Sequence, residues 1–272
     1  MDVNLFKKKY GSWAIVVGSA EGLGEAYSIA LAKRNINLIM VDNKQNSLST
    51  LAKQLELDFN IETIELCLDL SDSDAVKKMM HDIQKVDCRL LIYNAAYSLI
   101  KPFVNHSEEE LDCFIDINTR SQLKLVHQFS KLLVDKKQAG GILLMSSLAG
   151  LIGMQLVSTY AATKAFAWNL AEGLHYELKP KDIHVMSCIA GATLTPTYLK
   201  NKPTYGLIKP LVMKSEDVAE SALNSLGKKA LYIPGFSNRM NYFILTRLLP
   251  RKFAASIANK TMLTMFKHQS KN

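Results

Sequence analysis

The sequence predicts an α/β fold: a doubly wound parallel sheet of about seven strands, with helices on both faces and a helical C-terminal extension. Short apolar, β-branched runs alternate with helix-forming segments along most of the chain, which is the pattern of parallel strands joined by helices. A glycine-rich stretch joins the first run to the first helix. The 272 residues, 48% of them hydrophobic, suffice for one large domain. We expect that domain over residues 1–235 and the extension over residues 236–272.

The expected strands are short and rich in residues typical of buried sheets. They cover residues 13–17, 37–41, 61–68, 89–93, 142–146, 183–189 and 230–233. Helices are expected between them, up to residue 34, over 44–57, up to 85, up to 136 and over 158–179. Ser71 is expected to cap the helix that ends at residue 85. Ser107 and Glu110 form a capping-box pattern that opens a single long helix up to residue 136.

Gly18, Gly22 and Gly24 form the turn between the first strand and the first helix, with the spacing G-x-x-x-G-x-G. Glycine lets the backbone approach a pyrophosphate closely, and the helix N-terminus offers free N–H groups and the positive end of the helix dipole. This context predicts a dinucleotide site. A glycine turn that only closes the strand–helix unit is the weaker alternative.

Asp42 follows the second expected strand, 18 residues after Gly24. An acidic side chain at this place can accept hydrogen bonds from the adenosine ribose, and it repels a 2′-phosphate. Glu21 adds negative charge inside the glycine turn. We therefore expect NAD as the cofactor, with NADP less favoured. Asp42 can also cap the following helix, and the two roles are compatible.

Tyr160 and Lys164 are four residues apart, and Ser147 precedes Tyr160 by 13 positions. Residues four apart share one face of a helix, so the Lys164 ammonium is expected beside the Tyr160 phenol. A nearby cation favours the phenolate, which makes Tyr160 a candidate acid and base near neutral pH. Ser147, at the end of an expected strand, could hydrogen-bond the same reacting oxygen. An ordinary amphipathic helix with a surface lysine is the alternative.

Basic charge is concentrated in the extension, where residues 236–272 hold seven basic and no acidic side chains. The rest of the chain holds 26 basic and 25 acidic side chains, and this balance argues against nucleic-acid binding. The four cysteines lie far apart and the histidines lack ligand spacing, so we expect reduced core thiols and no metal. No apolar run approaches the roughly 20 residues of a membrane-spanning helix, and the N-terminus does not resemble a secretory signal. We expect a cytoplasmic protein, with membrane association as an open alternative.

Taken in order, these motifs resemble the short-chain dehydrogenase/reductase family over roughly residues 12–235. The resemblance rests on the glycine turn, on the YAATK segment from Tyr160 to Lys164 and on further pieces between and after them. Those pieces are Asp69-Leu70, Asn94-Ala95-Ala96, Asn118, Ser147 and residues 191–195. The resemblance implies a Rossmann-type catalytic domain and an oxidoreductase that acts on CH–OH groups with NAD or NADP.

The resemblance also implies a catalytic tetrad. Tyr160 would be the general acid/base, and Ser147 would hold the substrate oxygen. Lys164 would lower the pKa of Tyr160 and bind the nicotinamide ribose, while Asn118 would hold a water in a proton relay. The cofactor-binding residues, implied or inferred above, are Gly18, Ser19, Glu21, Gly22, Leu23, Gly24, Asp42, Asn43, Asp69, Leu70, Asn94, Ala95, Ala96, Tyr160, Lys164, Gly191, Thr193 and Thr195.

Two apolar segments flank the reactive oxygen in this fold. They indicate either a bulky, mostly apolar substrate or a surface that packs against the extension or a second subunit. One contains Leu148 and Met154, and the other contains Tyr198; with Ser147 and Tyr160 they form the predicted substrate set. We expect NAD-dependent interconversion of a secondary alcohol and a ketone on a steroid-like or 3-hydroxyacyl/3-oxoacyl molecule. The alternatives are an NADPH-dependent 3-oxoacyl or ketosteroid reductase and a non-catalytic nucleotide-binding regulatory or membrane-surface protein.

The extension from residue 251 onwards is compatible with a basic amphipathic helix. Lys260, Lys267 and Lys271 fall on one side of this helix, and Ala254, Ala258, Met262 and Met265 fall on another. The apolar side either packs over the substrate pocket or a partner subunit, which is slightly favoured, or lies on an anionic membrane. In each case we expect the extension to border the substrate entrance. A homo-oligomer, dimer or tetramer, is also expected.

Overall fold

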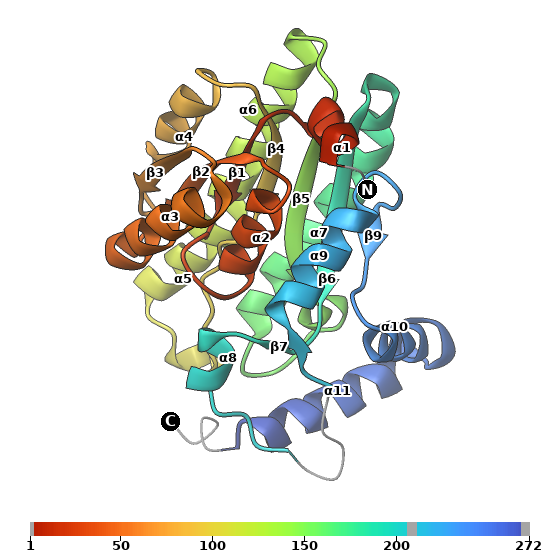
Figure 1. Cartoon of the computed structure of the whole chain (residues 1–272). Helices are drawn as coiled ribbons and strands as arrows, with labels where there is room; N and C mark the ends of the chain where they lie inside the picture. The colour runs from red at the N-terminus through yellow and green to blue at the C-terminus, as the bar shows by residue number, and fades with distance from the viewer. Residues whose placement is uncertain (1–2, 206–210, 268–272) are drawn as a thin grey trace.

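The computed structural model describes residues 3–205 and 211–267. Its centre is a seven-stranded sheet in the order β3-β2-β1-β4-β5-β6-β9, in which every neighbouring pair is parallel. Helices cover both faces of this sheet (Figure 1). The chain runs outward from β1 to β3 and then continues on the other side of β1 from β4, so the strand order reverses between β1 and β4. The predicted doubly wound fold is confirmed, and its reversal marks the expected ligand crevice.

The strands of the main sheet are short, as predicted. They are β1 (Trp13–Val17), β2 (Asn37–Asp42), β3 (Thr63–Cys67), β4 (Cys88–Tyr93), β5 (Gly140–Ser147), β6 (Ile183–Ala190) and β9 (Leu231–Tyr232). A separate ladder pairs β7 (Thr193–Leu194) with β8 (Met213–Lys214). Successive side chains point to opposite faces of a sheet, and Ala14 and Val16 accordingly lie in one core cluster while Ile15 and Val17 lie in the other.

Eleven α-helices are described within these ranges, together with shorter 3₁₀ and π segments. The α-helices are α1 (Val3–Tyr10), α2 (Gly22–Ala32), α3 (Gln45–Phe59), α4 (Ala75–Ile83), α5 (Glu108–Ile115), α6 (Ser121–Asp135), α7 (Ser158–Leu178), α8 (Pro196–Lys200), α9 (Ser215–Ser225), α10 (Phe236–Phe243) and α11 (Arg251–Met265). The 3₁₀ segments are η1 (Phe103–Asn105), η3 (Leu148–Leu151) and η4 (Lys179–Lys181), and the π segments are η2 (Asp116–Arg120) and η5 (Ile244–Leu248).

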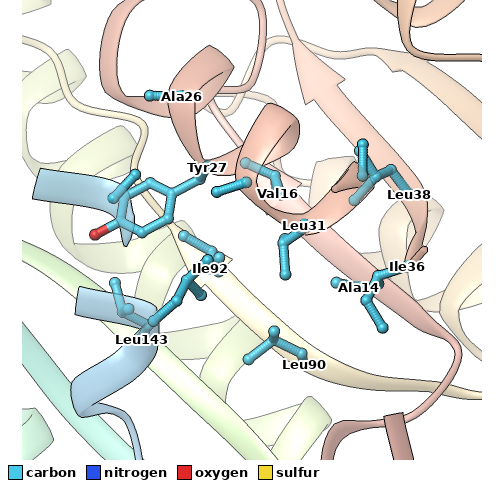
Figure 2. Close-up of a cluster of buried hydrophobic side chains, with 14 of the residues drawn as sticks. Ala14, Val16, Ala26, Tyr27, Leu31, Ile36, Leu38, Leu90, Ile92 and Leu143 are labelled. Carbon is cyan, nitrogen blue, oxygen red and sulfur yellow. The ribbon is translucent and has the colours of Figure 1, made fainter. Parts of the chain in front are cut away.

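The two faces of the sheet have separate cores. Helices α2, α3 and α9 pack on one face, where Figure 2 shows Tyr27 and Leu31 of α2 beside Val16, Ile92 and Leu143 of the sheet. Helices α4, α6 and α7 pack on the other face. Because both faces are covered, the central strands are apolar on both sides, and their sequences read as continuous apolar runs.

The segment predicted as one helix up to residue 136 consists of three pieces: α5, the π segment η2 and α6. The predicted capping box is present, since Ser107 and Glu110 exchange hydrogen bonds of 3.3 and 3.1 Å between side chain and backbone. The π segment contains the buried Asn118. The wider π turn lets this amide face the interior, where it hydrogen-bonds Tyr97 and Thr163.

Other local predictions were wrong. Ser71 does not cap α4, because its hydroxyl donates to Asp69 and the helix begins later, after Asp74. Cys67 is exposed rather than buried, although all four cysteines are free. Helix α1 was not predicted. It is anchored by Phe6 and Tyr10, which are buried on one face four residues apart.

The extension folds back onto the carboxyl end of the sheet. Ala254, Ala258 and Met262 of α11 are buried, whereas Lys260 and Lys267 are exposed. The predicted helix and its packed apolar side are therefore present, while Lys271 lies outside the described residues. No helix in residues 3–205 or 211–267 is both long and apolar enough to cross a membrane.

Candidate active site

The end of β5 and the start of α7 bring Ser147, Tyr160 and Lys164 together. Tyr160 and Lys164 are one turn apart on α7, and the Lys164 ammonium lies 5.6 Å from the centre of the Tyr160 ring. Lys164 donates a hydrogen bond of 2.9 Å to the Met145 carbonyl, and the Ser146 hydroxyl donates one of 2.7 Å to the Lys164 carbonyl. These two bonds fix the helix against the last residues of β5.

Ser147 lies between β5 and η3. Its hydroxyl oxygen accepts a hydrogen bond of 3.2 Å from Ala149 N–H, and its side chain also hydrogen-bonds the Tyr160 phenol. The loop can approach α7 closely because residue 150 is glycine: a Cβ there would lie 2.8 Å from the backbone nitrogen of Ala165. The serine and the phenol are therefore placed to contact one substrate oxygen together.

Burial determines the protonation of this pair. It raises the pKa of Tyr160 to about 12, against a smaller lowering effect of the hydrogen bond from Ser147. Burial also lowers the pKa of Lys164 to about 8. The direction for Tyr160 is opposite to the predicted lowering, because desolvation of the phenolate outweighs the other influences. A neutral phenol can donate a proton. The reduction of a ketone to an alcohol needs such a donor at the carbonyl oxygen.

Asn118 is 2% exposed and lies on η2, beside α7. Its Oδ1 accepts from Tyr97 N–H at 2.7 Å, and its Nδ2 donates to the Tyr97 carbonyl at 2.9 Å and to Thr163 Oγ1 at 3.0 Å. Thr163 in turn donates to the Tyr160 carbonyl at 2.9 Å. The amide thus links the segment after β4 to the catalytic turn of α7. Its predicted role in holding a water stays a prediction.

Thr163 and Tyr97 were not among the predicted site residues. Thr163 lies three positions after Tyr160, which places it within the same helical turn, so the spacing contained a signal for its contribution. The signal for Tyr97 was weaker, because only its backbone groups take part in the link to Asn118.

The glycine turn has the geometry that a pyrophosphate site needs. Gly18 has φ +79°, and a Cβ on it would lie 2.7 Å from the Ala95 backbone. A Cβ on Gly24 would lie 1.7 Å from the Gly18 carbonyl oxygen. Asn94 Nδ2 donates to that same oxygen at 2.8 Å. Only glycine fits these positions, and their close packing brings the N-terminus of α2 beside the segment after β4.

Asp42 reaches the glycine turn from the end of β2. Its carboxylate accepts hydrogen bonds of 2.9 Å from Ala20 N–H and 3.1 Å from Lys44 N–H. Glu21 forms an ion pair with the Lys44 ammonium. The negative charge expected from Glu21 is therefore balanced locally by Lys44.

The remaining predicted cofactor residues border the same crevice or its neighbouring strand ends. Thr195 approaches the glycine turn, since a Cβ on Gly22 would lie 3.2 Å from its side chain. Thr193 is buried and donates to the Gly191 carbonyl at 3.1 Å. Leu70 is buried, and Asp69 is exposed after β3. The glycine turn contains Ser19, and Leu23 lies at the start of α2. Asn43 follows β2, and Asn94, Ala95 and Ala96 follow β4.

Apolar side chains cover the phenol side of the site. Leu156, Val157, Met262 and Phe266 form a buried cluster, against which Tyr160 and other partly buried side chains pack. Those partners include Met154, Ile100 and Met265, while Leu148 packs in the adjoining cluster under the extension. Tyr198 lies in α8, where its N–H donates to Thr195 Oγ1 at 3.1 Å. Its predicted substrate contact stays a prediction.

The crevice fits a dinucleotide. The backbone at Gly18 and Gly24 leaves no space for a side chain. The N-terminus of α2, where free N–H groups are available, follows β1 and lies at the carboxyl edge of the sheet. Within residues 3–205 and 211–267, no group of three or more His, Cys, Asp or Glu side chains is placed to hold a metal ion.

The chain is similar to known proteins. The family model for short chain dehydrogenases matches residues 12–205. A 7beta-hydroxysteroid dehydrogenase from Clostridium sardiniense is 32% identical over 234 residues, which cover 86% of this chain and 89% of that protein. A very-long-chain 3-oxoacyl-CoA reductase from Mus musculus is 30% identical over 223 residues, covering 80% of this chain and 70% of that protein.

Solved structures show the same fold. One, from work on 7beta-hydroxysteroid dehydrogenase stereoselectivity, matches with a TM-score of 0.86 at 23% identity, covering 93% of this chain and 98% of that chain. A short-chain dehydrogenase from Sphingobium yanoikuyae in complex with NADPH matches with a TM-score of 0.76 at 24% identity, covering 90% and 95%. One from Mycobacterium paratuberculosis bound to NAD matches with a TM-score of 0.74 at 22% identity, covering 86% and 100%.

The matched family segment contains the glycine turn, Asn118, Ser147, Tyr160 and Lys164. The chain therefore belongs to the short-chain dehydrogenase family and is an oxidoreductase that acts on CH–OH groups with NAD or NADP.

Proposed function

We propose that this protein interconverts a secondary alcohol and a ketone on a bulky, steroid-like substrate, with NAD as the preferred cofactor. The observation that carries the proposal is the double environment of Tyr160. Its hydroxyl meets Ser147 on one side, and its ring packs against the apolar cluster of Leu156, Val157, Met262 and Phe266 on the other. A substrate whose oxygen reacts at Tyr160 would lie beside this apolar cluster, which supports a molecule with a large apolar body.

In the reduction direction, a reduced nicotinamide held at this site would supply the hydride for the carbonyl carbon. Tyr160 donates its phenolic proton to the carbonyl oxygen, and Ser147 steadies that oxygen with a hydrogen bond. Lys164 stabilises the phenolate that results and would hold the nicotinamide ribose. The pKa of Tyr160, about 12 before any cofactor binds, keeps the phenol protonated at neutral pH.

Cofactor preference rests on Asp42. Its carboxylate is held beside Ala20 N–H of the glycine turn, where the adenosine ribose is expected, and a 2′-phosphate there would meet a negative charge. Lys44 is engaged with Glu21, so its ammonium is not aimed at this place. Solved structures of the fold contain either NADPH or NAD. The chain's own residues favour NAD.

The substrate class follows from the apolar wall and from the relatives. The loop from residue 148 to residue 157 contains no lysine or arginine, so it offers no clamp for the phosphates of a coenzyme A thioester. Relatives include 7beta-hydroxysteroid dehydrogenases and very-long-chain 3-oxoacyl-CoA reductases. The uncharged loop favours the hydroxysteroid over the acyl thioester.

The test is a substrate panel followed by nicotinamide absorbance in both directions. The panel contains steroids with a hydroxyl group at different ring positions, 3-hydroxyacyl thioesters of several lengths, and a small secondary alcohol. Each is assayed with NAD and with NADP. We expect the highest kcat/KM with a hydroxysteroid and NAD. Faster turnover of an acyl thioester with NADPH would replace this proposal with the 3-oxoacyl reductase alternative.

A further inference from the structure

The extension has a second apolar face, which is distinct from the packed one. On α10, Phe236, Met240 and Phe243 are 71%, 43% and 49% exposed. Their spacing of four and three residues places them on one side of the helix, opposite the buried Asn238. It is unusual for an apolar helix side to face away from the core, and such a surface is a candidate contact site.

Helix α11 repeats this arrangement. Phe253 and Ile257 are 62% and 52% exposed, and they face away from the buried side of Ala254, Ala258 and Met262. Leu248, at the junction of the two helices, is 60% exposed. Both helices lie at the same end of the molecule, below the carboxyl edge of the sheet (Figure 1). The outer face of the extension, as the name is used below, comprises Phe236, Met240, Phe243, Leu248, Phe253 and Ile257.

The charges on the extension all have one sign. Arg239, Arg247, Arg251, Lys252 and Lys260 are exposed on α10, η5 and α11, and residues 236–272 contain no Asp or Glu. Exposed aromatic and aliphatic side chains interleaved with cations are the composition of a helix that lies in the interface of an anionic bilayer.

We propose that the outer face of the extension docks the protein on an anionic lipid bilayer. The six apolar side chains would enter the acyl boundary, and the five cations would contact lipid phosphates. A second copy fits this face less well, because a twofold contact pairs a patch with itself and would bring arginine against arginine. Sequence patterning alone assigns the apolar side of α11 to the membrane, to the pocket or to a partner subunit. The structure shows that side packed inward and a different set of residues exposed.

Docking here also has a consequence for access. The inner side of α11 contributes Met262 to the cluster that packs against Tyr160, so a bilayer under the outer face would lie one helix away from the pocket. An apolar substrate could then enter from the lipid. This consequence rests on the proposed function, whereas the docking itself does not.

The test is co-sedimentation of the full-length protein with phosphatidylcholine vesicles, with and without phosphatidylserine, at low and high salt. We expect binding that needs phosphatidylserine and weakens with salt. Phe253→Ser with Ile257→Ser should weaken it about tenfold or more, and Arg251→Gln with Lys252→Gln about 25-fold, since each basic residue is worth about fivefold.

Matched controls are Leu5→Ser with Leu57→Ser, which remove two other exposed leucines, and Lys53→Gln with Lys124→Gln, which remove two exposed lysines elsewhere. Both should bind like the wild type. Thermal unfolding should show that all variants stay folded, because every substituted side chain is exposed. Absence of wild-type binding to anionic vesicles overturns the proposal. The proposal is also overturned if the wild type binds no vesicles but forms a dimer in sedimentation velocity, and the variant with Phe253→Ser and Ile257→Ser does not form that dimer. None of these measurements uses turnover. The vesicle-binding result therefore tests the docking proposal even if the steroid assignment fails.

Discussion

Asn259 of α11 and Gln155 of the loop after β5 hold each other through two hydrogen bonds. Gln155 N–H donates to Asn259 Oδ1 at 2.7 Å, and Gln155 Nε2 donates to the Asn259 carbonyl at 3.0 Å. Asn259 Nδ2 also donates to the Gly153 carbonyl at 3.0 Å. The extension therefore fixes the loop that carries Met154, one of the side chains that pack near Tyr160.

Asn259→Ala removes the side-chain half of this link and should loosen the loop around Met154. We expect KM for a bulky substrate to rise about tenfold, because the two side-chain hydrogen bonds to the loop, near 1 kcal/mol each, are lost with partial compensation by water. Both kcat and KM for a small alcohol should change little. Asn169→Ala, which removes a bond within α7 only, is the matched control. Equal effects on the small and the bulky substrate would contradict a role in positioning this loop.

In the cofactor-free protein, Lys164 should lower the free energy of unfolding at neutral pH. Its pKa falls from the ordinary lysine value of 10.5 to about 8 in the fold, so the folded protein binds its proton less readily than the unfolded chain. The penalty is complete below pH 8, shrinks as pH rises, and is absent above pH 10.5. One pKa unit corresponds to 1.36 kcal/mol, so the penalty is on the order of 3 kcal/mol, offset by about 1 kcal/mol for the bond to Met145.

Lys164→Met should therefore raise the free energy of unfolding by about 2 kcal/mol at pH 7, with the gain fading toward pH 10.5, while turnover is lost. Urea unfolding across this pH range measures it, and Lys53→Met on the exposed side of α3 serves as control. A variant that is less stable than the wild type at pH 7 would show that burial does not penalise this lysine.

Asp42→Arg should transfer cofactor preference from NAD toward NADP. The substitution removes the charge that repels a 2′-phosphate and supplies a guanidinium that pairs with it. A charge-assisted hydrogen bond is worth about 1.5–3 kcal/mol, so the ratio of the two affinities should move by about 10- to 100-fold. Nicotinamide fluorescence gives both affinities, with Asp58→Arg on the exposed end of α3 as control. A parent protein that binds both cofactors equally would remove the basis of this prediction.

The fold was predictable because each signal was local and strong. Buried strands read as apolar runs, and the glycine turn could be located because a Cβ at Gly24 would collide with the Gly18 carbonyl. Tyr160 and Lys164 could be paired because helical spacing alone brings them together.

What could not be predicted depends on distant contacts. The π turn at Asn118 exists because its amide reaches Tyr97 and Thr163, and helical periodicity carries no sign of it. The pKa of Tyr160 rises through burial by several elements at once, whereas the sequence showed only the nearby lysine. The link between Gln155 and Asn259 spans 104 positions and leaves no local pattern.

The most direct test of the central claim compares the wild type with Tyr160→Phe, using a hydroxysteroid and NAD. The substitution keeps the ring in its apolar cluster and removes only the transferable proton. We predict turnover by the wild type and a loss of about 10²- to 10⁴-fold in kcat for Tyr160→Phe. NADH binding, measured by nicotinamide fluorescence, should be retained. Near-normal turnover by Tyr160→Phe, with that binding intact, would contradict the claim that Tyr160 is the acid and base of this enzyme.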